Sequence, residues 1–189
     1  MHCVRTVTDH LYWVGANDHR LHLFENIHPI PRGVSYNAYL LLDEKSVLFD
    51  TVDWSACRQL LENIAYLLDG KPLDYLVINH MEPDHGASIE EILLRYPQVK
   101  IIILTSYEDD ENVFQAFKLG VSDYVLKNSR QEELITCVKD AYAGRSPIRP
   151  VIAEKIRREF QRVKQSEDSF LYNLMLVTQL TQTEIDILD

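Results

Sequence analysis

The sequence predicts an α/β protein with three regions: strands and turns, then a parallel sheet with helices on its faces, then a helical tail. Apolar runs of strand length alternate with amphipathic runs of helical period between about residues 54 and 144, a pattern typical of a largely parallel sheet. After Gly144 this alternation stops, and a proline-containing stretch leads into a charged amphipathic segment. A chain of 189 residues is long enough for one sizeable domain.

The first fifty residues predict strands joined by turns. Residues 10–16 are rich in aromatic and branched side chains, which favours a strand. Residues 20–34 contain two prolines and a glycine, so we expect a loop there. Residues 35–52 hold two strand-like runs with a polar bend at residues 43–45, which predicts a hairpin.

Strands and helices are then expected in alternation. A helix over residues 54–70 places apolar residues at helical intervals and ends at a glycine. The following segments predict strands over 73–79, 99–106 and 121–127, which should be neighbours in one sheet, and helices over 88–97, 110–120 and 129–144. Ser129 and Glu132 have the spacing of a capping box for the last helix.

The tail predicts a linker and further helix. Residues 145–150 carry two prolines, and residues 151–165 form a charged amphipathic helix. An apolar segment follows, and residues 180–189 have the pattern of a capped helix that begins and then meets the end of the chain, which suggests truncation.

Composition narrows the class of protein. There are 29 acidic residues against 19 Lys and Arg, so a nucleic-acid groove is not favoured. The three cysteines are scattered, which argues against a disulfide framework. The N-terminus lacks a secretory pattern, and no apolar run is long enough to cross a bilayer, so we expect a cytoplasmic protein without membrane contact.

A cluster of ligand-type side chains follows the first buried strand. The stretch "INHMEPDH" contains His80, Glu82, Asp84 and His85. Parallel sheets carry functional groups at the carboxyl ends of their strands, and imidazole with carboxylate suits iron, manganese or zinc. In extended backbone the first three side chains face the same way, whereas His85 joins them only if the loop turns. The alternative is a polar loop with satisfied histidines, but four such residues in six positions favour a metal site.

The motif H-x-E-x-D-H resembles the metal signature of the flavodiiron proteins, a branch of the metallo-β-lactamase fold. The stretches "LYWVGANDHRLHLFEN", "PIPRGVSYNAYLL" and "DEKSVLFDTV" extend the resemblance over about residues 5–100. It implies half of an αββα sandwich and a non-heme diiron site that reduces oxygen or nitric oxide with electrons from FMN. It also implies that His80 and Glu82 bind one iron and Asp84 the other, with His85 a ligand in some members only.

The remainder of that site has no counterpart in the sequence. The family needs two further histidines and a bridging aspartate downstream, and His85 is the last histidine of this chain. Other candidates do not lie in matching motifs: His2, His10, His19, His22, His28, Asp109, Asp110, Asp123 and Asp140. We therefore expect weak binding of iron, or of zinc in its place, because affinity depends on ligand number and preset geometry. FMN is not expected on this chain, so an active form would need an electron-donor flavoprotein as a partner, and whether the chain is an enzyme stays open.

Residues 96–144 resemble the last half of a response-regulator receiver domain instead. The resemblance implies that Thr105 is the hydroxyl that senses a phosphoryl group, Tyr124 the switch aromatic and Lys127 the lysine that pairs with phosphoaspartate. A hydroxyl donor and a fixed cation both stabilise a phosphoryl dianion. Asn79 falls at the acceptor position, and an amide accepts no phosphoryl group.

The tail resembles the linker and the opening of the helix-turn-helix domain of LuxR-type transcription factors. Because the recognition helix is absent from the sequence, specific DNA reading is not expected. The resemblances divide the chain into a metallo-β-lactamase-like half-domain over 1–96, a receiver-like half-domain over 97–145, and a linker helix with a truncated helix-turn-helix over 146–189.

Three functions follow from these features. The first is a flavodiiron-type metal-binding fragment with an incomplete site. The second is a degenerate receiver module of two-component signalling, and the third is a recombined chain without independent activity. A half sandwich leaves one sheet face open, so a homo-oligomer or another partner is expected to cover it.

Overall fold

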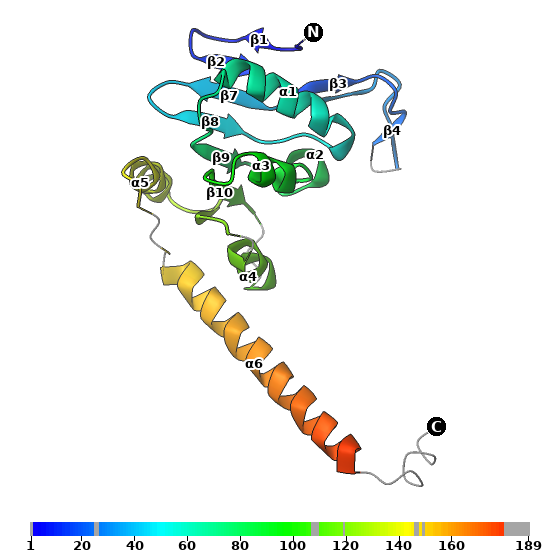
Figure 1. The fold of residues 1–189 in the computed structure, drawn as a ribbon, viewed down its shortest axis with the longest axis vertical. Helices are drawn as coiled ribbons and strands as arrows, with labels where there is room; N and C mark the ends of the chain where they lie inside the picture. Colours follow the sequence, from blue (N-terminus) through cyan, green and yellow to red (C-terminus); the bar gives the residue numbers. More distant parts are fainter. Residues whose placement is uncertain are drawn as a thin grey trace.

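The computed structural model describes residues 2–24, 27–106, 110–118, 120–145, 148 and 150–179. Its body is one seven-stranded sheet with the order β1-β2-β7-β8-β9-β10-β11 (Figure 1). The strands are β1 Arg5–Thr6, β2 Leu11–Trp13, β7 Tyr39–Leu42, β8 Ser46–Phe49, β9 Tyr75–Ile78, β10 Lys100–Thr105 and β11 Asp123–Leu126. Two small hairpin-like pairs flank it: β3 Ala16–Asp18 with β6 Val34–Tyr36, and β4 Leu23–Phe24 with β5 His28–Pro29.

The sheet is antiparallel in its first part and parallel in its second. β7 and β8 form the expected hairpin, and β2 extends it antiparallel. β9, β10 and β11 are parallel neighbours, which confirms that the three predicted strands lie side by side. β8 also pairs in parallel with β9, so the parallel part begins one strand earlier than the sequence pattern indicated. This pairing joins the two halves of the chain into one sheet.

The helices cover the two faces unequally. They are η1 Trp54–Ala56, α1 Cys57–Leu68, α2 Pro83–Gly86, α3 Ile89–Arg95, α4 Asp110–Lys118, α5 Gln131–Tyr142 and α6 Pro150–Gln179. Ile64 of α1, Ile92 of α3 and Val113 of α4 belong to one core cluster on one face. Right-handed crossovers that advance in one direction place their helices on the same face, and these three connections do so. Cys137 of α5 packs with Ile102 in a second cluster on the opposite face.

Several predicted details are wrong. The expected loop over 20–34 contains the short strands β4 and β5, because two-residue pairings need no alternating pattern. Helix α5 begins at Gln131 after Arg130, and no side chain caps it, so Ser129 lies one residue too early for the predicted capping box. The predicted helix over residues 151–165 is present and is longer than expected: within the described residues it runs from Pro150 to Gln179, and proline is tolerated in the first turn of a helix.

The face of β2, β7 and β8 that lies opposite α1 has half-buried apolar side chains. Trp13 lies beside Tyr39, and Tyr39 beside Phe49, across neighbouring strands. All three are half-buried, as are Leu11 and Leu41 next to them. A partner that covers this face stays a prediction. Among the described residues, no helix is long and apolar enough to cross a membrane.

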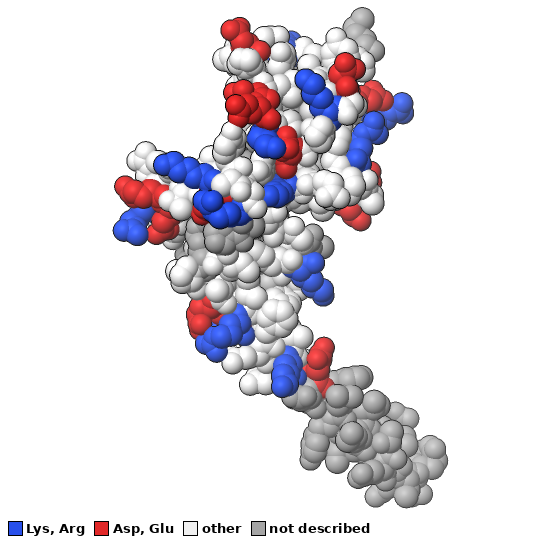
Figure 2. Space-filling model, turned by 60° about the vertical axis from the view of Figure 1, so that its left-hand side comes forward, with Lys and Arg blue, Asp and Glu red and all other residues white. Residues whose placement is uncertain are grey.

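Helix α6 leaves the body after it has packed against α4. Ile152 of α6 is buried, and the rings of Phe114 and Phe160 meet edge to face with their centroids 4.9 Å apart. The rest of the helix extends away from the sheet (Figure 1). On the face shown in Figure 2, basic and acidic side chains are interspersed, and this face presents no basic stripe of the kind that binds nucleic acid.

Candidate functional site

The carboxyl ends of four parallel strands form one edge of the sheet. Asp50 follows β8, Asn79 and His80 follow β9, Thr105 ends β10, and Lys127 follows β11. Because β8, β9, β10 and β11 run in the same direction as neighbours, these residues share one edge. In open α/β sheets this is the edge at which ligands bind.

Asp50 connects the ends of β8 and β9. Its carboxylate accepts a hydrogen bond of 2.6 Å from the backbone N–H of Asn79 and another of 3.1 Å from the Asn79 side chain. Its own N–H donates to the carbonyl of Val77 at 2.8 Å. Asp50 adopts a left-handed backbone with φ of 60°, which Asp tolerates better than most residues do. Asp50 is not among the site residues predicted from the sequence, although an acid directly after a buried strand is a usable signal.

The histidine loop is held against the end of β8 by hydroxyl groups. Thr51 donates to the carbonyl of His85 through both its backbone N–H and its side-chain hydroxyl. The hydroxyl of Ser88 donates to the carbonyl of Val52 at 2.9 Å. Both hydroxyl-bearing residues are buried, so the loop has a defined position.

The four predicted ligands lie in this loop, and each histidine lies close to a carboxylate of the same loop. His80 Nε2 is 3.0 Å from Glu82 Oε2, and His85 Nε2 is 3.4 Å from Asp84 Oδ2. The two imidazole rings lie edge to face with centroids 5.4 Å apart. The chain turns into α2 at Pro83, so the extended alternation ends at Glu82 and His85 turns back to within 3.5 Å of Asp50 Oδ2.

This geometry does not fit a diiron centre. Within the residues that the structure describes, no three His, Cys, Asp or Glu side chains are placed to hold one metal ion. Two atoms of suitable chemistry are nevertheless buried without a hydrogen-bond partner, namely Asp84 Oδ1 and His85 Nδ1. Carboxylate oxygen and imidazole nitrogen are both donor types that bind transition metals, and His85 Nδ1 also lies 3.5 Å from Asp50 Oδ2.

The other histidines and aspartates, which were not predicted as ligands, lie elsewhere. The upstream histidines, His2, His10, His19, His22 and His28, are all exposed. Asp110 pairs with Lys155 of α6, and Asp140 pairs with Arg145. Asp123 is buried in β11, and Asp109 lies outside the described residues.

The edge is acidic. Burial raises the pKa of Tyr36, and the nearby charges of Asp53, Asp18 and Asp84 raise it further. Carboxylates close enough to act on one phenol together create a negative potential, which attracts a cation and repels a phosphate. A phosphoryl group would therefore approach this edge more readily with a bound cation.

The receiver-like residues are separated into two environments. Thr105 is buried at the end of β10, and its carbonyl accepts the backbone N–H of Lys127 at 2.8 Å. The Lys127 side chain is exposed just beyond β11. Tyr124 is only 2% exposed, belongs to the core cluster beneath α3 and α4, and lines the same cavity as Glu82, so its role as a switch aromatic stays a prediction.

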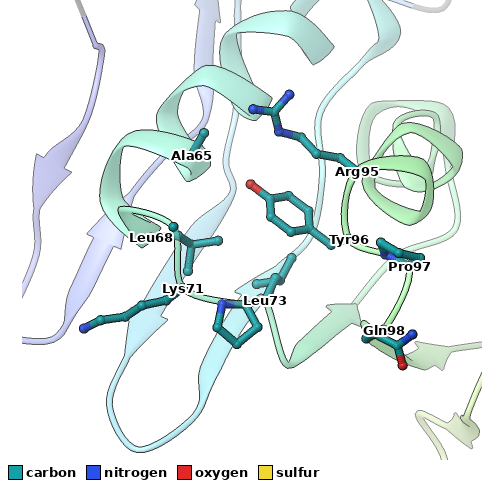
Figure 3. Close-up of a pocket in the computed structure, with 10 residues that line it drawn as sticks. Ala65, Leu68, Lys71, Leu73, Arg95, Tyr96, Pro97 and Gln98 are labelled. Atoms are coloured by element: carbon teal, nitrogen blue, oxygen red, sulfur yellow. The ribbon is translucent and has the colours of Figure 1, made fainter.

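One cavity lies away from the polar edge, and a second borders the histidine loop. Figure 3 shows a pocket of about 630 Å³ at the amino ends of β9 and β10, with the ring of Tyr96 pointing toward α1. Its lining residues include Lys71 and Arg95 and no acid or histidine, so it offers no catalytic set. A second cavity, of about 780 Å³, lies beside Glu82 and is mainly apolar.

Comparisons with known proteins agree with both resemblances. The response regulator receiver domain family matches residues 50–139. The chain is 36% identical over 107 residues to the anaerobic nitric oxide reductase flavorubredoxin of Klebsiella pneumoniae, a match that covers 56% of this chain and 22% of that protein. It is 38% identical over 96 residues to the flavo-diiron protein FprA2 of Clostridium acetobutylicum, covering 51% of this chain and 24% of that protein.

Solved structures show the same relationship. Rubredoxin oxygen:oxidoreductase from Desulfovibrio gigas aligns with a TM-score of 0.53 at 32% identity, over 66% of this chain and 30% of that one. The flavodiiron protein of Giardia intestinalis shares the fold, with a TM-score of 0.55 at 22% identity, over 68% of this chain and 31% of that one. The chain thus spans less than a third of these relatives.

The receiver match begins well before residue 97, the expected start of the receiver-like half-domain. The matched segment and the 107 residues aligned to flavorubredoxin together exceed the length of the chain, so the two likenesses share residues. The β8-α1-β9 unit explains how a parallel α/β pattern can extend back to Asp50. The division into 1–96, 97–145 and 146–189 stays a prediction.

Proposed function

We propose that this chain is a flavodiiron-type metal-binding module with an incomplete site, and that it does not reduce oxygen or nitric oxide on its own. The observation that carries the proposal is that two buried atoms in the loop with the H-x-E-x-D-H motif form no hydrogen bond, namely Asp84 Oδ1 and His85 Nδ1, the second of which lies 3.5 Å from the Asp50 carboxylate. Its homologues are flavodiiron proteins, two of which are named as nitric oxide or oxygen reductases.

In this proposal each residue of the loop has a limited role. Asp84 and His85 would hold one divalent cation, iron or zinc, which would satisfy their buried atoms. Asp50 positions the loop through Asn79 and adds negative charge beside His85. His80 Nε2 lies 3.0 Å from Glu82 Oε2 at the rim, where both side chains are 39% exposed. Reduction of a substrate would require further ligands and an electron-donor flavoprotein.

Metal titration tests the proposal. Metal-free protein is titrated with Zn²⁺, and with Fe²⁺ without oxygen, by calorimetry and elemental analysis. We expect binding of about one ion per chain at micromolar or weaker affinity, because few protein ligands are available. His85→Ala should weaken this binding at least about tenfold, whereas His10→Ala, an exposed histidine outside the loop, should leave it unchanged. Two tightly bound ions per chain, or no binding by the wild type, would overturn the proposal.

A second candidate is a degenerate receiver module. The receiver match over residues 50–139, together with Thr105 and Lys127 at neighbouring strand ends, favours it. Asn79 excludes a phosphoaspartate at its position, so such a module would bind a phosphoryl group without covalent transfer. The C-terminal residues 180–189, which carry the likeness to a helix-turn-helix opening, lie outside the described residues, and that part of the reading stays a prediction.

Phosphoryl-analogue binding separates the two candidates. Inorganic phosphate with Mg²⁺, as a free phosphoryl analogue, should perturb the amide signals of Thr105 and Lys127 if the receiver function survives. Lys127→Ala should abolish the effect, while Lys118→Ala, an exposed lysine on α4, should not. A chain that binds neither metal nor the analogue would fit the third function, a recombined product without independent activity.

A further inference from the structure

We propose that the pocket in Figure 3 binds a small organic carboxylate with an apolar body, a medium-chain or aromatic acid. The pocket lies at the amino ends of β9 and β10, whereas the histidine loop follows the carboxyl end of β9. The inference therefore goes beyond the proposed function and does not depend on it. It rests on the apolar floor of the pocket and on the cations at its rim.

Three segments build the walls of the pocket. The end of α1 contributes Ala65 and Leu68, the turn into β9 contributes residues 70–73, and the end of α3 with the loop after it contributes residues 95–98. Leu68 and Leu73 are almost fully buried, with exposures of 1% and 2%, so they form an apolar floor. A volume of about 630 Å³ lies within the range of small-molecule sites, so the pocket can cover the apolar part of such a ligand.

Two cations lie at the rim of this pocket without an acidic partner. Lys71 and Arg95 are both exposed, and within the described part of the chain neither forms an ion pair. Glu91 precedes Arg95 by four residues on α3, a spacing at which helical ion pairs form, yet no ion pair joins these two described residues. Among the described residues no acid lines the pocket, although the chain has 29 acids. This local positive charge favours an anionic ligand.

The hydrogen-bond donors at the rim suit a carboxylate. Figure 3 shows the Arg95 guanidinium and the Tyr96 hydroxyl both directed toward α1. Neither group makes a hydrogen bond to another residue that the structure describes. A guanidinium binds the two oxygens of a carboxylate through parallel N–H groups, and a phenol can donate to one of these oxygens. Arg95 and Tyr96 thus supply the recognition of the anion, and Lys71 adds a second charge.

The end of α1 does not require a cationic ligand in the pocket. The carbonyls of Ala65 and Leu68 already accept backbone N–H groups, from Asp69 at 3.2 Å and from Lys71 at 2.9 Å. Because these carbonyls are satisfied within the chain, they need no donor from a bound molecule.

The cavity beside the histidine loop has the opposite charge. Glu82 and Glu90 line it, and no Lys or Arg is among its described lining residues. Both cavities offer apolar surface, so charge distinguishes the ligands that they accept. An apolar carboxylate should therefore enter the pocket at Arg95 and be repelled from the cavity beside Glu82.

Titration of the full chain with octanoate, followed by NMR, tests the proposal. The amide signals of Leu73 and Tyr96 should shift to saturation with a Kd of about one millimolar or below, as expected of a ligand with about ten non-hydrogen atoms. The amide signal of His85, at the opposite edge of the sheet, should not shift. Octylamine has the same chain and the opposite charge, and acetate lacks the apolar chain. Both should bind at least about tenfold more weakly.

Matched variants assign the binding to named groups. Arg95→Gln should raise the octanoate Kd at least about tenfold, whereas Arg32→Gln, which removes an exposed arginine outside the pocket, should leave it within about twofold. Tyr96→Phe should raise the Kd about threefold, because it removes one neutral donor. Metal binding by the histidine loop should be unchanged in Arg95→Gln, which separates this inference from the proposed function.

Three results would overturn the proposal. The first is an absence of saturable shifts at Leu73 and Tyr96. The second is octylamine binding as tight as that of octanoate, which would show a merely apolar pocket. The third is an Arg95→Gln variant that binds octanoate as the wild type does.

Discussion

At the scale of single residues, Asp50 connects the sheet to the candidate site. One carboxylate accepts two hydrogen bonds from Asn79 and lies near His85. It is only 9% exposed, so its partners would be left unsatisfied if it were removed. The position of the histidine loop therefore depends on an acid that lies on a different strand.

Two substitutions of Asp50 should distinguish how much stability its side-chain hydrogen bonds contribute. Asp50→Ala should lower the free energy of unfolding by about 2 kcal/mol, because charged hydrogen bonds are lost and buried donors lose their acceptor. Asp50→Asn should cost less than half of that, because an amide oxygen still accepts and Asn tolerates positive φ. Urea unfolding measures both. If Asp50→Ala and Asp50→Asn lost the same free energy of unfolding, the hydrogen-bonding role of Asp50 would be contradicted.

Asp74 should make stability depend on pH. Burial alone would raise the pKa of Asp74, but hydrogen bonds from the Ser46 amide and the Lys45 ammonium outweigh it and hold this pKa below its ordinary value of 3.8. A lowered folded-state pKa adds stability that is present above the ordinary value and is lost as pH falls through the lowered one. Asp74→Asn should therefore be less stable by about 1–2 kcal/mol near neutral pH, with the difference shrinking in acid. Asp9→Asn, at an exposed position, should show no such trend.

At the scale of elements, local patterns identified most segments but not their ends. Helix α5 illustrates the limit. Its amphipathic period predicts the helix, but the capping box at Ser129 places its start one residue too early. Arg130 occupies the N-cap and makes no side-chain cap, although it pairs with Glu133 at 3.3 Å. A cation at a helix N-terminus also opposes the helix dipole.

Arg130→Asp should therefore stabilise the protein. An aspartate at the N-cap can accept a backbone N–H of the first turn and has a favourable charge there, together worth about 1 kcal/mol. Thermal unfolding should show a higher Tm for Arg130→Asp than for the wild type. Arg130→Ala removes the unfavourable cation but supplies no cap, so its Tm should rise less than that of Arg130→Asp. If the Tm rose equally in Arg130→Asp and Arg130→Ala, the stabilisation would come from removal of the arginine and not from a new N-cap.

At the scale of the whole molecule, β8 pairs in parallel with β9, and β9 with β10. This pairing joins the flavodiiron-like and receiver-like segments into one sheet. Ile103 on β10 is 2% exposed and shares a core cluster with Leu48 of β8 and Ile64 of α1. Continuous pairing and a shared core predict one cooperative unfolding unit rather than two.

Ile103→Ala tests this cooperativity. It should lower the free energy of unfolding by about 2–4 kcal/mol, as cavity-forming substitutions in a core do. In a Trp54→Phe background, Trp13 on β2 reports on the distant antiparallel part of the sheet. Its fluorescence and far-UV circular dichroism should shift to the same lower urea midpoint. If the Trp13 transition kept its original midpoint, the two parts of the sheet would be independent.

The sequence by itself determined the alternation of strands and helices after residue 54, the hairpin of β7 and β8, and the loop that carries His80, Glu82, Asp84 and His85. These features follow from side-chain period and from residue types close together in the chain, which are local properties. Tertiary structure alone decided that β8 lies beside β9, that Asp50 reaches Asn79 and His85, and that α4 covers one side of α6. Each of those contacts joins residues distant in sequence, where the pairing is selected by packing and hydrogen bonding of the whole sheet rather than by any local pattern.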